Sequence, residues 1–400
     1  MRRRSFVAAG AASLVAVRAG AQPSEGRLLR EWWYEPGGDA QQRFRVNAPE
    51  AALSKEHGAR PEVRANGLML IRVDEDLRKL RGAELYCELW GGHAGTRNKR
   101  VTINGRSTYA IPEIGSEGGH CTHQYPVIPL KVSDLVPGWN AVQFACDQGM
   151  SFWGHFIVDN ACIRAHIAPE DAGLTGFQAT VQAELAGEVA KLRLGATDPG
   201  PIASAEFQGF YEGYDENGDG QWRDWHGFTK ARRPVAFVGS SWDTSMLPKQ
   251  GGMRVRGYVR FHGQQQLLYE TGPSPEFSAG GPVRVFRSSD LPAPFWSRAG
   301  KRHRATIDVD LDPYKIERAE LHVVIWDGGR GNTKDHFKLN GRPLEVAARG
   351  RHDVIYRVLT LAPIWLRQGP NQIELLSDTE QHGLEVLLPG PAIVVRERTS

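Results

Sequence analysis

The feature that most constrains the fold of this 400-residue chain is an internal repeat. Residues 83–106, AELYCELWGGHAGTRNKRVTINGR, align without a gap with residues 319–342, AELHVVIWDGGRGNTKDHFKLNGR. Further along each copy, residues 138–144 (GWNAVQF) match residues 369–375 (GPNQIEL). Two matches in the same order rarely arise by chance, so the sequence predicts two copies of one domain separated by a different segment.

Both copies have the alternating pattern of strands that bury one face. The residues expected to point into the cores are Leu85, Cys87 and Leu89 in the first copy and Leu321, Val323 and Ile325 in the second. Asn-Gly follows a strand-like run at 104–105 and at 340–341, which is typical of a tight hairpin turn because both residues tolerate positive φ. Such strands and turns predict a jelly-roll β-sandwich for each copy, at residues 40–168 and 280–397.

The segment between the copies, residues 169–272, has a strand-like pattern of its own. Every second residue from Phe177 to Leu185 is apolar, with an amphipathic helix over 176–194 as the alternative. Further strands are expected at 203–210, 234–238 and 252–262. The expected fold class is therefore all-β: two jelly-roll β-sandwiches related by the repeat, and a central immunoglobulin-like β-sandwich.

Residues 1–21 are predicted to be an export signal rather than part of the fold. Three arginines precede a short apolar stretch, and Ala19-Gly20-Ala21 provides a cleavage site. The run Arg3-Arg4-Ser5-Phe6-Val7 is similar to a twin-arginine signal, with an ordinary secretory signal as the alternative. The protein is therefore expected to be exported, to the periplasm or the extracellular space.

The charge of the mature chain limits its partners. Removal of the signal takes away four arginines and changes the formal net charge from +3 to −1. No polybasic tract remains, so neither nucleic acid nor anionic lipid is an expected partner. No later segment reaches the ~18 apolar residues that a transmembrane helix needs.

All four cysteines lie in the first copy: Cys87, Cys121, Cys146 and Cys162. An exported protein can form disulfides, and four cysteines allow three connectivities between which the sequence does not choose. Buried free thiols are the alternative.

The repeated unit resembles the galactose-binding-domain-like jelly rolls, which occur as carbohydrate-binding modules and as accessory domains of glycoside hydrolases and lyases. The resemblance rests on the Trp-containing strand, the Asn-Gly turn and a Leu-x-x-Gly-x-Asn run at 135–140 and 366–371. It covers about 60% of the chain and implies sugar binding by loops at one end of a sandwich. The middle segment resembles an immunoglobulin or fibronectin-type spacer.

Sugar binding requires aromatic rings that stack on pyranose faces and polar groups that fix hydroxyls. The candidates near the repeated turns are Trp90, Asn104 and Arg106, with their copies Trp326, Asn340 and Arg342. The alternative is structural: the tryptophans fill the rim of each sandwich and the asparagines close hairpins.

A second group of candidates consists of histidines that the second copy mostly lacks: His93, His120, His123 and His155. If their loops converge, the imidazoles could bind a divalent metal or act as an acid–base pair, with Glu113 or Glu117 as a carboxylate partner. Histidines in polar loops also serve as simple hydrogen-bonding groups. No nucleophile-elbow, P-loop or zinc-protease motif occurs in the sequence.

The middle segment contains a run that begins like a calcium loop. Its candidate ligands are Asp215, Asn217, Asp219 and Asp224. The twelfth position is His226 rather than the usual Glu, and turns rich in Asp and Asn also form without metal. Trp222 and Trp225 in the same run are candidates for stacking on a saccharide.

The favoured hypothesis is an exported protein that binds carbohydrate or polysaccharide, without catalytic activity of its own and with calcium as the candidate cofactor. One alternative is a polysaccharide lyase or glycoside hydrolase that uses the histidines of the first copy. The other is a structural module that docks another exported protein.

Overall fold

The computed structural model describes the chain in fourteen stretches. They are residues 25–35, 44–46, 67–92, 96–112, 122–147, 155–214, 222–231, 238–292, 295–296, 302–328, 333, 335–346, 353–376 and 383–399. Strands and short 3-10 helices make up their regular structure, so the predicted all-β class is confirmed. The predicted export signal lies outside these stretches. Within them, no helix has the length and apolarity needed to cross a bilayer.

The first sandwich consists of two sheets that enclose one core. One sheet, called the inner sheet, contains in spatial order β1 (Arg27–Trp33), β10 (Phe156–His166), β4 (Gly82–Trp90) and β8 (Val127–Leu130). The other, called the outer sheet, contains β3 (Leu68–Val73), β9 (Gly138–Asp147), β5 (Arg97–Ile103) and β6 (Ser107–Ala110). The short β2 (Phe44–Val46) and β7 (His123–Gln124) pair with β10 and β4. Leu85, Cys87 and Leu89 lie in the core between the sheets, as their alternation predicted.

The third sandwich repeats this strand order. Its inner strands are β19 (Val283–Arg287), β28 (Ala392–Glu397), β22 (Ile316–Asp327) and β25 (Asp353–Leu361), and its outer strands are β21 (His303–Val309), β26 (Gly369–Leu375), β23 (Phe337–Leu339) and β24 (Arg342–Pro343). The remaining strands, β27 (Leu384–Val386) and β20 (Phe295–Trp296), extend the inner sheet. The register also repeats: Ala83 faces Leu130 across one ladder, and Ala319 faces Leu361 across the equivalent one.

The middle sandwich packs a three-stranded sheet against the end of a larger one. The first sheet contains β11 (Ala179–Ala186), β12 (Val189–Ala196) and β15 (Val238–Asp243). The second contains β14 (Arg223–Ala231), β13 (Ile202–Glu212), β16 (Gln250–Phe261), β17 (Gln264–Glu270) and β18 (Phe277–Ala279). Two strands therefore occupy 179–196, and the helix alternative for this region is wrong. Gly187 turns the chain between them with φ of 65°, a conformation that favours glycine.

Strand β1 joins the first sandwich to the middle one. One of its edges pairs with β10 and the other with β17, so one sheet continues through both units. The carboxylate of Glu31 on β1 is 1% exposed and bonds Arg164 of β10 at 2.9 Å and Arg260 of β16 at 2.5 Å. The first sandwich thus includes a strand that precedes its expected start at residue 40.

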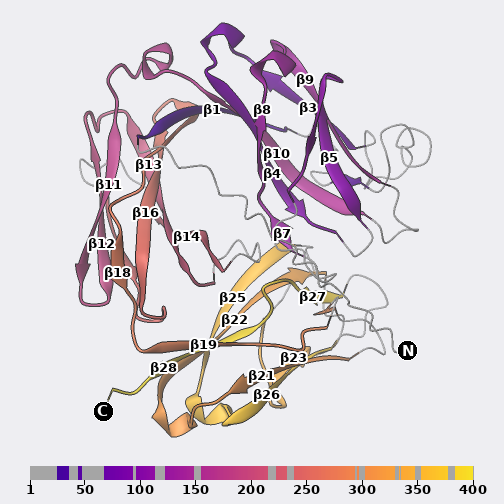
Figure 1. Cartoon of the computed structure of the whole chain (residues 1–400), viewed down its shortest axis with the longest axis vertical. Coiled ribbons are helices and arrows are strands. Elements are labelled where there is room, and N and C mark those ends of the chain that lie inside the picture. Colours follow the sequence, from indigo (N-terminus) through magenta and orange to yellow (C-terminus); the bar gives the residue numbers. More distant parts are fainter. Residues whose placement is uncertain are drawn as a thin grey trace, which may run out of the picture.

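The third sandwich contacts both other units. In Figure 1 it lies at the bottom, with the first sandwich at the upper right and the middle one at the left. An apolar cluster combines Trp90 of the first sandwich, Tyr214 of the middle one and Val324 of the third. An ion pair of 2.8 Å between Arg396 and Glu188 also links the third sandwich to the middle one.

The described cysteines are buried free thiols. Cys87, Cys146 and Cys162 form no disulfide, and Cys121 lies outside the described residues. Burial raises the pKa of the Cys87 and Cys162 thiols, which keeps them protonated and unreactive. The disulfide interpretation therefore does not hold for these three residues.

Candidate functional site

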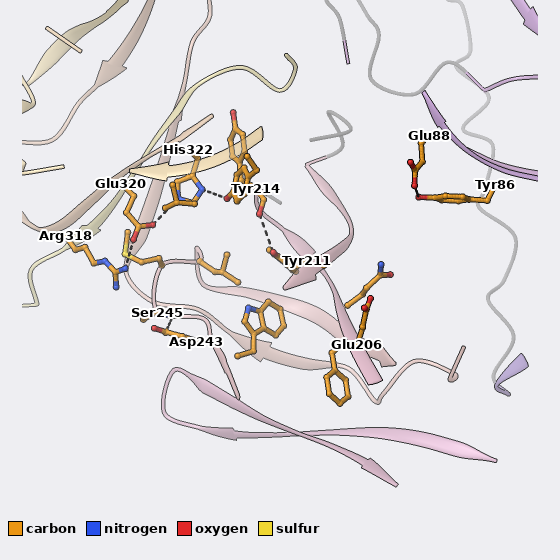
Figure 2. A pocket seen from close by; sticks show the side chains of 18 of the residues that line it. Tyr86, Glu88, Glu206, Tyr211, Tyr214, Asp243, Ser245, Arg318, Glu320 and His322 are labelled. Atoms are coloured by element: carbon orange, nitrogen blue, oxygen red, sulfur yellow. Dashed lines mark hydrogen bonds and ion pairs between the residues drawn. The ribbon is translucent and has the colours of Figure 1, made fainter. Parts of the chain in front are cut away.

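A pocket of about 890 Å³ lies where the three sandwiches meet, and is called the central pocket below. The first sandwich lines it with Trp33, Tyr86 and Glu88. The middle sandwich contributes Glu206, Phe207, Gln208, Tyr211, Tyr214, Gly227, Trp242, Asp243, Ser245, Met246 and Leu247. The third sandwich contributes Arg318, Glu320, His322, Tyr356 and Val358. Figure 2 shows Glu320 and His322 on one side of the pocket and Tyr86 and Glu88 on the other.

Strand alternation explains why these side chains face the pocket. On β4, Cys87 is fully buried in the core, so Tyr86 and Glu88 on either side of it must leave the opposite face of the sheet. On β22, buried Leu321 and Val323 likewise place His322 on the outer face. In each of the two related inner sheets, the face that points away from the core therefore forms one wall of the pocket.

The wall from the third sandwich carries a chain of hydrogen bonds. The hydroxyl of Tyr356 lies 2.7 Å from Nδ1 of His322, and Nε2 of His322 lies 3.0 Å from Oε2 of Glu320. Arg318 donates to the other carboxylate oxygen at 2.5 Å. Burial acts to raise the pKa of Glu320, but the bonds and charges of His322 and Arg318 outweigh it and lower that pKa. Glu320 is therefore an ionised acceptor at neutral pH.

In the wall from the first sandwich, the pKa of the carboxyl group is shifted in the opposite direction. The Tyr86 hydroxyl donates a long bond of 3.5 Å to Glu88, and the Tyr86 ring meets Trp33 edge-on with centroids 5.7 Å apart. Burial, assisted by the nearby charge of Asp159, raises the pKa of Glu88, although His123 opposes the shift. Two carboxyl groups in one pocket thus have pKa values displaced in opposite directions.

The wall from the middle sandwich is the most aromatic. The rings of Tyr211 and Trp242 pack with centroids 4.9 Å apart. Hydrogen bonds from the Ser245 side chain and backbone lower the pKa of the Asp243 carboxyl. Glu206 is exposed at the pocket surface.

The predicted turn residues serve the outer sheets. Asn104 has φ of 49° in the hairpin between β5 and β6, and its Nδ2 donates to the Asp134 carbonyl and to Asn140 Oδ1, both at 2.8 Å. Its Oδ1 accepts from the Ala141 backbone at 2.8 Å. Arg106 donates to the Leu135 carbonyl at 3.1 Å.

The third sandwich repeats this arrangement. Asn340 has φ of 51° and bonds the Trp365 carbonyl and Asn371, while the Arg342 guanidinium lies over the Trp365 ring at 5.5 Å. None of these predicted binding residues is among those that line the central pocket.

Three of the four predicted tryptophans converge beside the pocket rather than on the sandwich ends. Trp90, 6% exposed, belongs to the apolar cluster that Trp222 and Trp326 also pack against. Arg287 stacks on Trp222 at 3.5 Å. Trp225 lies apart on β14, with the Arg256 guanidinium 4.4 Å from its ring.

Two of the four candidate histidines, His93 and His120, lie outside the described residues. His123 is buried and bonds the Tyr125 hydroxyl at 2.7 Å and Asp159 at 2.9 Å. His155 is also buried, with its ring centroid 5.3 Å from that of Trp90. Neither described histidine lines the central pocket.

Most of the candidate calcium ligands lie outside the described residues. Asp215, Asn217 and Asp219 lie outside the described stretches, and Asp224 lies on β14 opposite Tyr211. In the part of the chain that the structure describes, no cluster of three His, Cys, Asp or Glu side chains could hold a metal ion.

The pocket residues were missed from sequence because each belongs to an ordinary outward face. Tyr86 and His322 occupy the same position of the repeat. In the third sandwich, His322 bonds Glu320 on the same strand. An ionisable pair spaced by two on the non-core face of a central strand was the available signal.

Comparison with known proteins gives little further information. No protein-family model and no curated protein matches the chain. One similar solved structure is a β-porphyranase of glycoside hydrolase family 86 from the human gut bacterium Bacteroides plebeius, with 12% identity, coverage of 56% of this chain and 37% of that one, and a TM-score of 0.25. Another is the Ruminococcus gnavus β-glucuronidase, with 9% identity, 66% and 47% coverage and a TM-score of 0.20. The chain thus spans less than half of each, and likeness at this level supports no conclusion about function.

Proposed function

We propose that the protein is an exported carbohydrate-binding protein whose binding site is the central pocket. The observation that carries this proposal is the composition of the walls, since each sandwich lines the pocket with an aromatic ring and a carboxylate. These pairs of residues are Tyr86 and Glu88, Trp242 and Asp243, and Tyr356 and Glu320.

Such pairs match the chemistry of a saccharide. An aromatic face packs against the C–H face of a pyranose ring, and carboxylates accept hydrogen bonds from its hydroxyl groups. The volume of about 890 Å³ falls within the range of small-ligand sites and is enough for a short oligosaccharide.

The resemblance of the repeated unit to galactose-binding-like jelly rolls supports the same ligand class. The proposed location differs from that family's loop-end site, because Asn104 and Asn340 use their side chains in turns of the outer sheets. Polysaccharide is the proposed partner, met outside the cytoplasm after export.

A glycan array with the mature full-length protein tests this function. We expect binding to at least one oligosaccharide class, with affinity reduced about tenfold in Glu206→Ala, because a hydrogen bond to a charged group is worth about 1.5–3 kcal/mol. Glu184→Ala, at an exposed position of β11 outside the pocket, is the matched control and should bind normally. Absence of binding to every glycan, with calcium and with chelator, would refute the proposal.

A further inference from the structure

The hydrogen-bonded chain of the third sandwich has the composition of a catalytic triad. Its members are a hydroxyl (Tyr356), an imidazole (His322) and a carboxylate (Glu320), joined at 2.7 and 3.0 Å. In nucleophilic catalysis a hydroxyl is activated by an adjacent base, which a third group orients. All three residues line the central pocket.

The proton positions follow from the acceptors. Glu320 is an ionised carboxylate and can only accept, so Nε2 of His322 carries the proton of their bond. In the neutral imidazole, Nδ1 is then the unprotonated nitrogen, and it accepts from the Tyr356 hydroxyl. In that form the proton of Tyr356 points at the base that removes it.

Packing holds this geometry in place. The side chains of His322 and Glu320 are only 13% and 6% exposed. The ring of Tyr214 stacks on that of Tyr356 with centroids 6.3 Å apart and planes inclined by 14°. The related group in the first sandwich, Tyr125 with His123 and Asp159, is not among the lining residues of the pocket. Of these two described groups, the third-sandwich triad is thus the one presented to a pocket ligand.

We propose that Tyr356 is a nucleophile activated by His322 and Glu320, and that the central pocket cleaves a glycoside. The choice of a glycoside rests on the proposed carbohydrate-binding function, whereas the activation of Tyr356 does not. Tyrosine is an established alternative to a carboxylate nucleophile in glycoside hydrolysis.

The reaction proceeds in two steps. In the first, Tyr356 Oη bonds to the anomeric carbon and the glycosidic C–O bond breaks with its electron pair on the departing oxygen. The phenolic proton moves to His322 Nδ1 and from there to the departing oxygen, which leaves as an alcohol. In the second, a water oxygen bonds to the anomeric carbon, the bond from that carbon to Tyr356 Oη breaks, and one water proton passes through His322 Nδ1 to Oη, so water is the only co-reactant.

An aryl sulfonyl fluoride tests the nucleophile without requiring the natural sugar. Attack by a phenol forms an S–O bond and releases fluoride, and peptide mass spectrometry gives the rate at each tyrosine. In the mature full-length protein, Tyr356 is expected to react faster than Tyr314, which is 81% exposed and serves as the reference for an ordinary tyrosine.

Variants separate activation from mere exposure. His322→Gln is expected to slow labelling of Tyr356 about 100-fold, the lower range for a general base, and Glu320→Gln is expected to slow it as well. Added imidazole should restore labelling in His322→Ala, which a purely structural role for His322 would not allow. His262→Gln, at an exposed position outside the pocket, is the histidine control and should leave labelling unchanged. Near-UV circular dichroism verifies folding.

The outcomes distinguish the two proposals. Labelling of Tyr356 no faster than of Tyr314, or equal labelling in folded His322→Gln, overturns the nucleophile even if glycans bind. His322-dependent labelling without binding to any glycan supports the nucleophile and refutes the carbohydrate function.

Discussion

Replacement of Asn140 by alanine should destabilise the first sandwich strongly. Asn140 is fully buried and makes four hydrogen bonds through its side chain. Its Oδ1 accepts from the Val136 backbone at 2.9 Å and from Asn104 at 2.8 Å, and its Nδ2 donates to the carbonyls of Val136 at 2.8 Å and Gly138 at 2.9 Å. At about 1 kcal/mol per bond, Asn140→Ala should lower the free energy of unfolding by about 4 kcal/mol.

The repeat supplies a replicate of this experiment. Asn371 is also fully buried and makes the same four bonds, to Asn340, to the Arg367 backbone N–H and to the carbonyls of Arg367 and Gly369, at 2.8–2.9 Å. Asn371→Ala should therefore destabilise the third sandwich by a similar amount. Urea denaturation followed by tryptophan fluorescence measures both, with exposed Gln178→Ala as the control. A loss below about 1 kcal/mol in both variants would refute the structural role of these asparagines.

Three further predictions follow from buried groups. Burial raises the pKa of Glu88 above its ordinary 4.5, so the contribution of Glu88 to folding stability is present below pH 4.5 and is lost as the pH rises through the folded pKa. Calorimetry should therefore find Glu88→Gln more stable than wild type at pH 7 but not at pH 3.5. Glu31→Gln leaves the guanidinium groups of Arg164 and Arg260 without their buried carboxylate and should cost about 3 kcal/mol in urea denaturation, a loss that an unchanged midpoint would contradict. The thiols of Cys87, Cys146 and Cys162 should resist a thiol reagent in the native protein and react in denaturant without reductant, and rapid native labelling would contradict their burial.

The sequence predicted those parts of the fold that depend on local pattern. Alternation identified Leu85, Cys87 and Leu89 as core residues, because period 2 assigns every second side chain to one face. The Asn-Gly turns at 104–105 and 340–341 were equally local, since positive φ selects these residue types. The same local reasoning separated the strands of 179–196 from a helix.

The candidate site could not be predicted in this way. Two of its walls meet because β1 pairs with β17, a contact between residues 27–33 and 264–270 that no local pattern specifies. Alternation shows that Tyr86 and His322 leave their cores, but not that another sandwich faces them. Aromatic residues near turns drew attention to the sandwich ends, although Trp90 and Trp326 pack between the units.

The most direct test of the account is to locate the bound glycan. A diazirine-bearing form of the best array ligand, photo-crosslinked to the protein and mapped by mass spectrometry, reports the residues that it contacts. The central pocket predicts crosslinks on β4, β13 and β22, one strand from each sandwich. Crosslinks confined to the hairpin turns at 104–106 and 340–342 would contradict it and assign sugar binding to the sandwich ends.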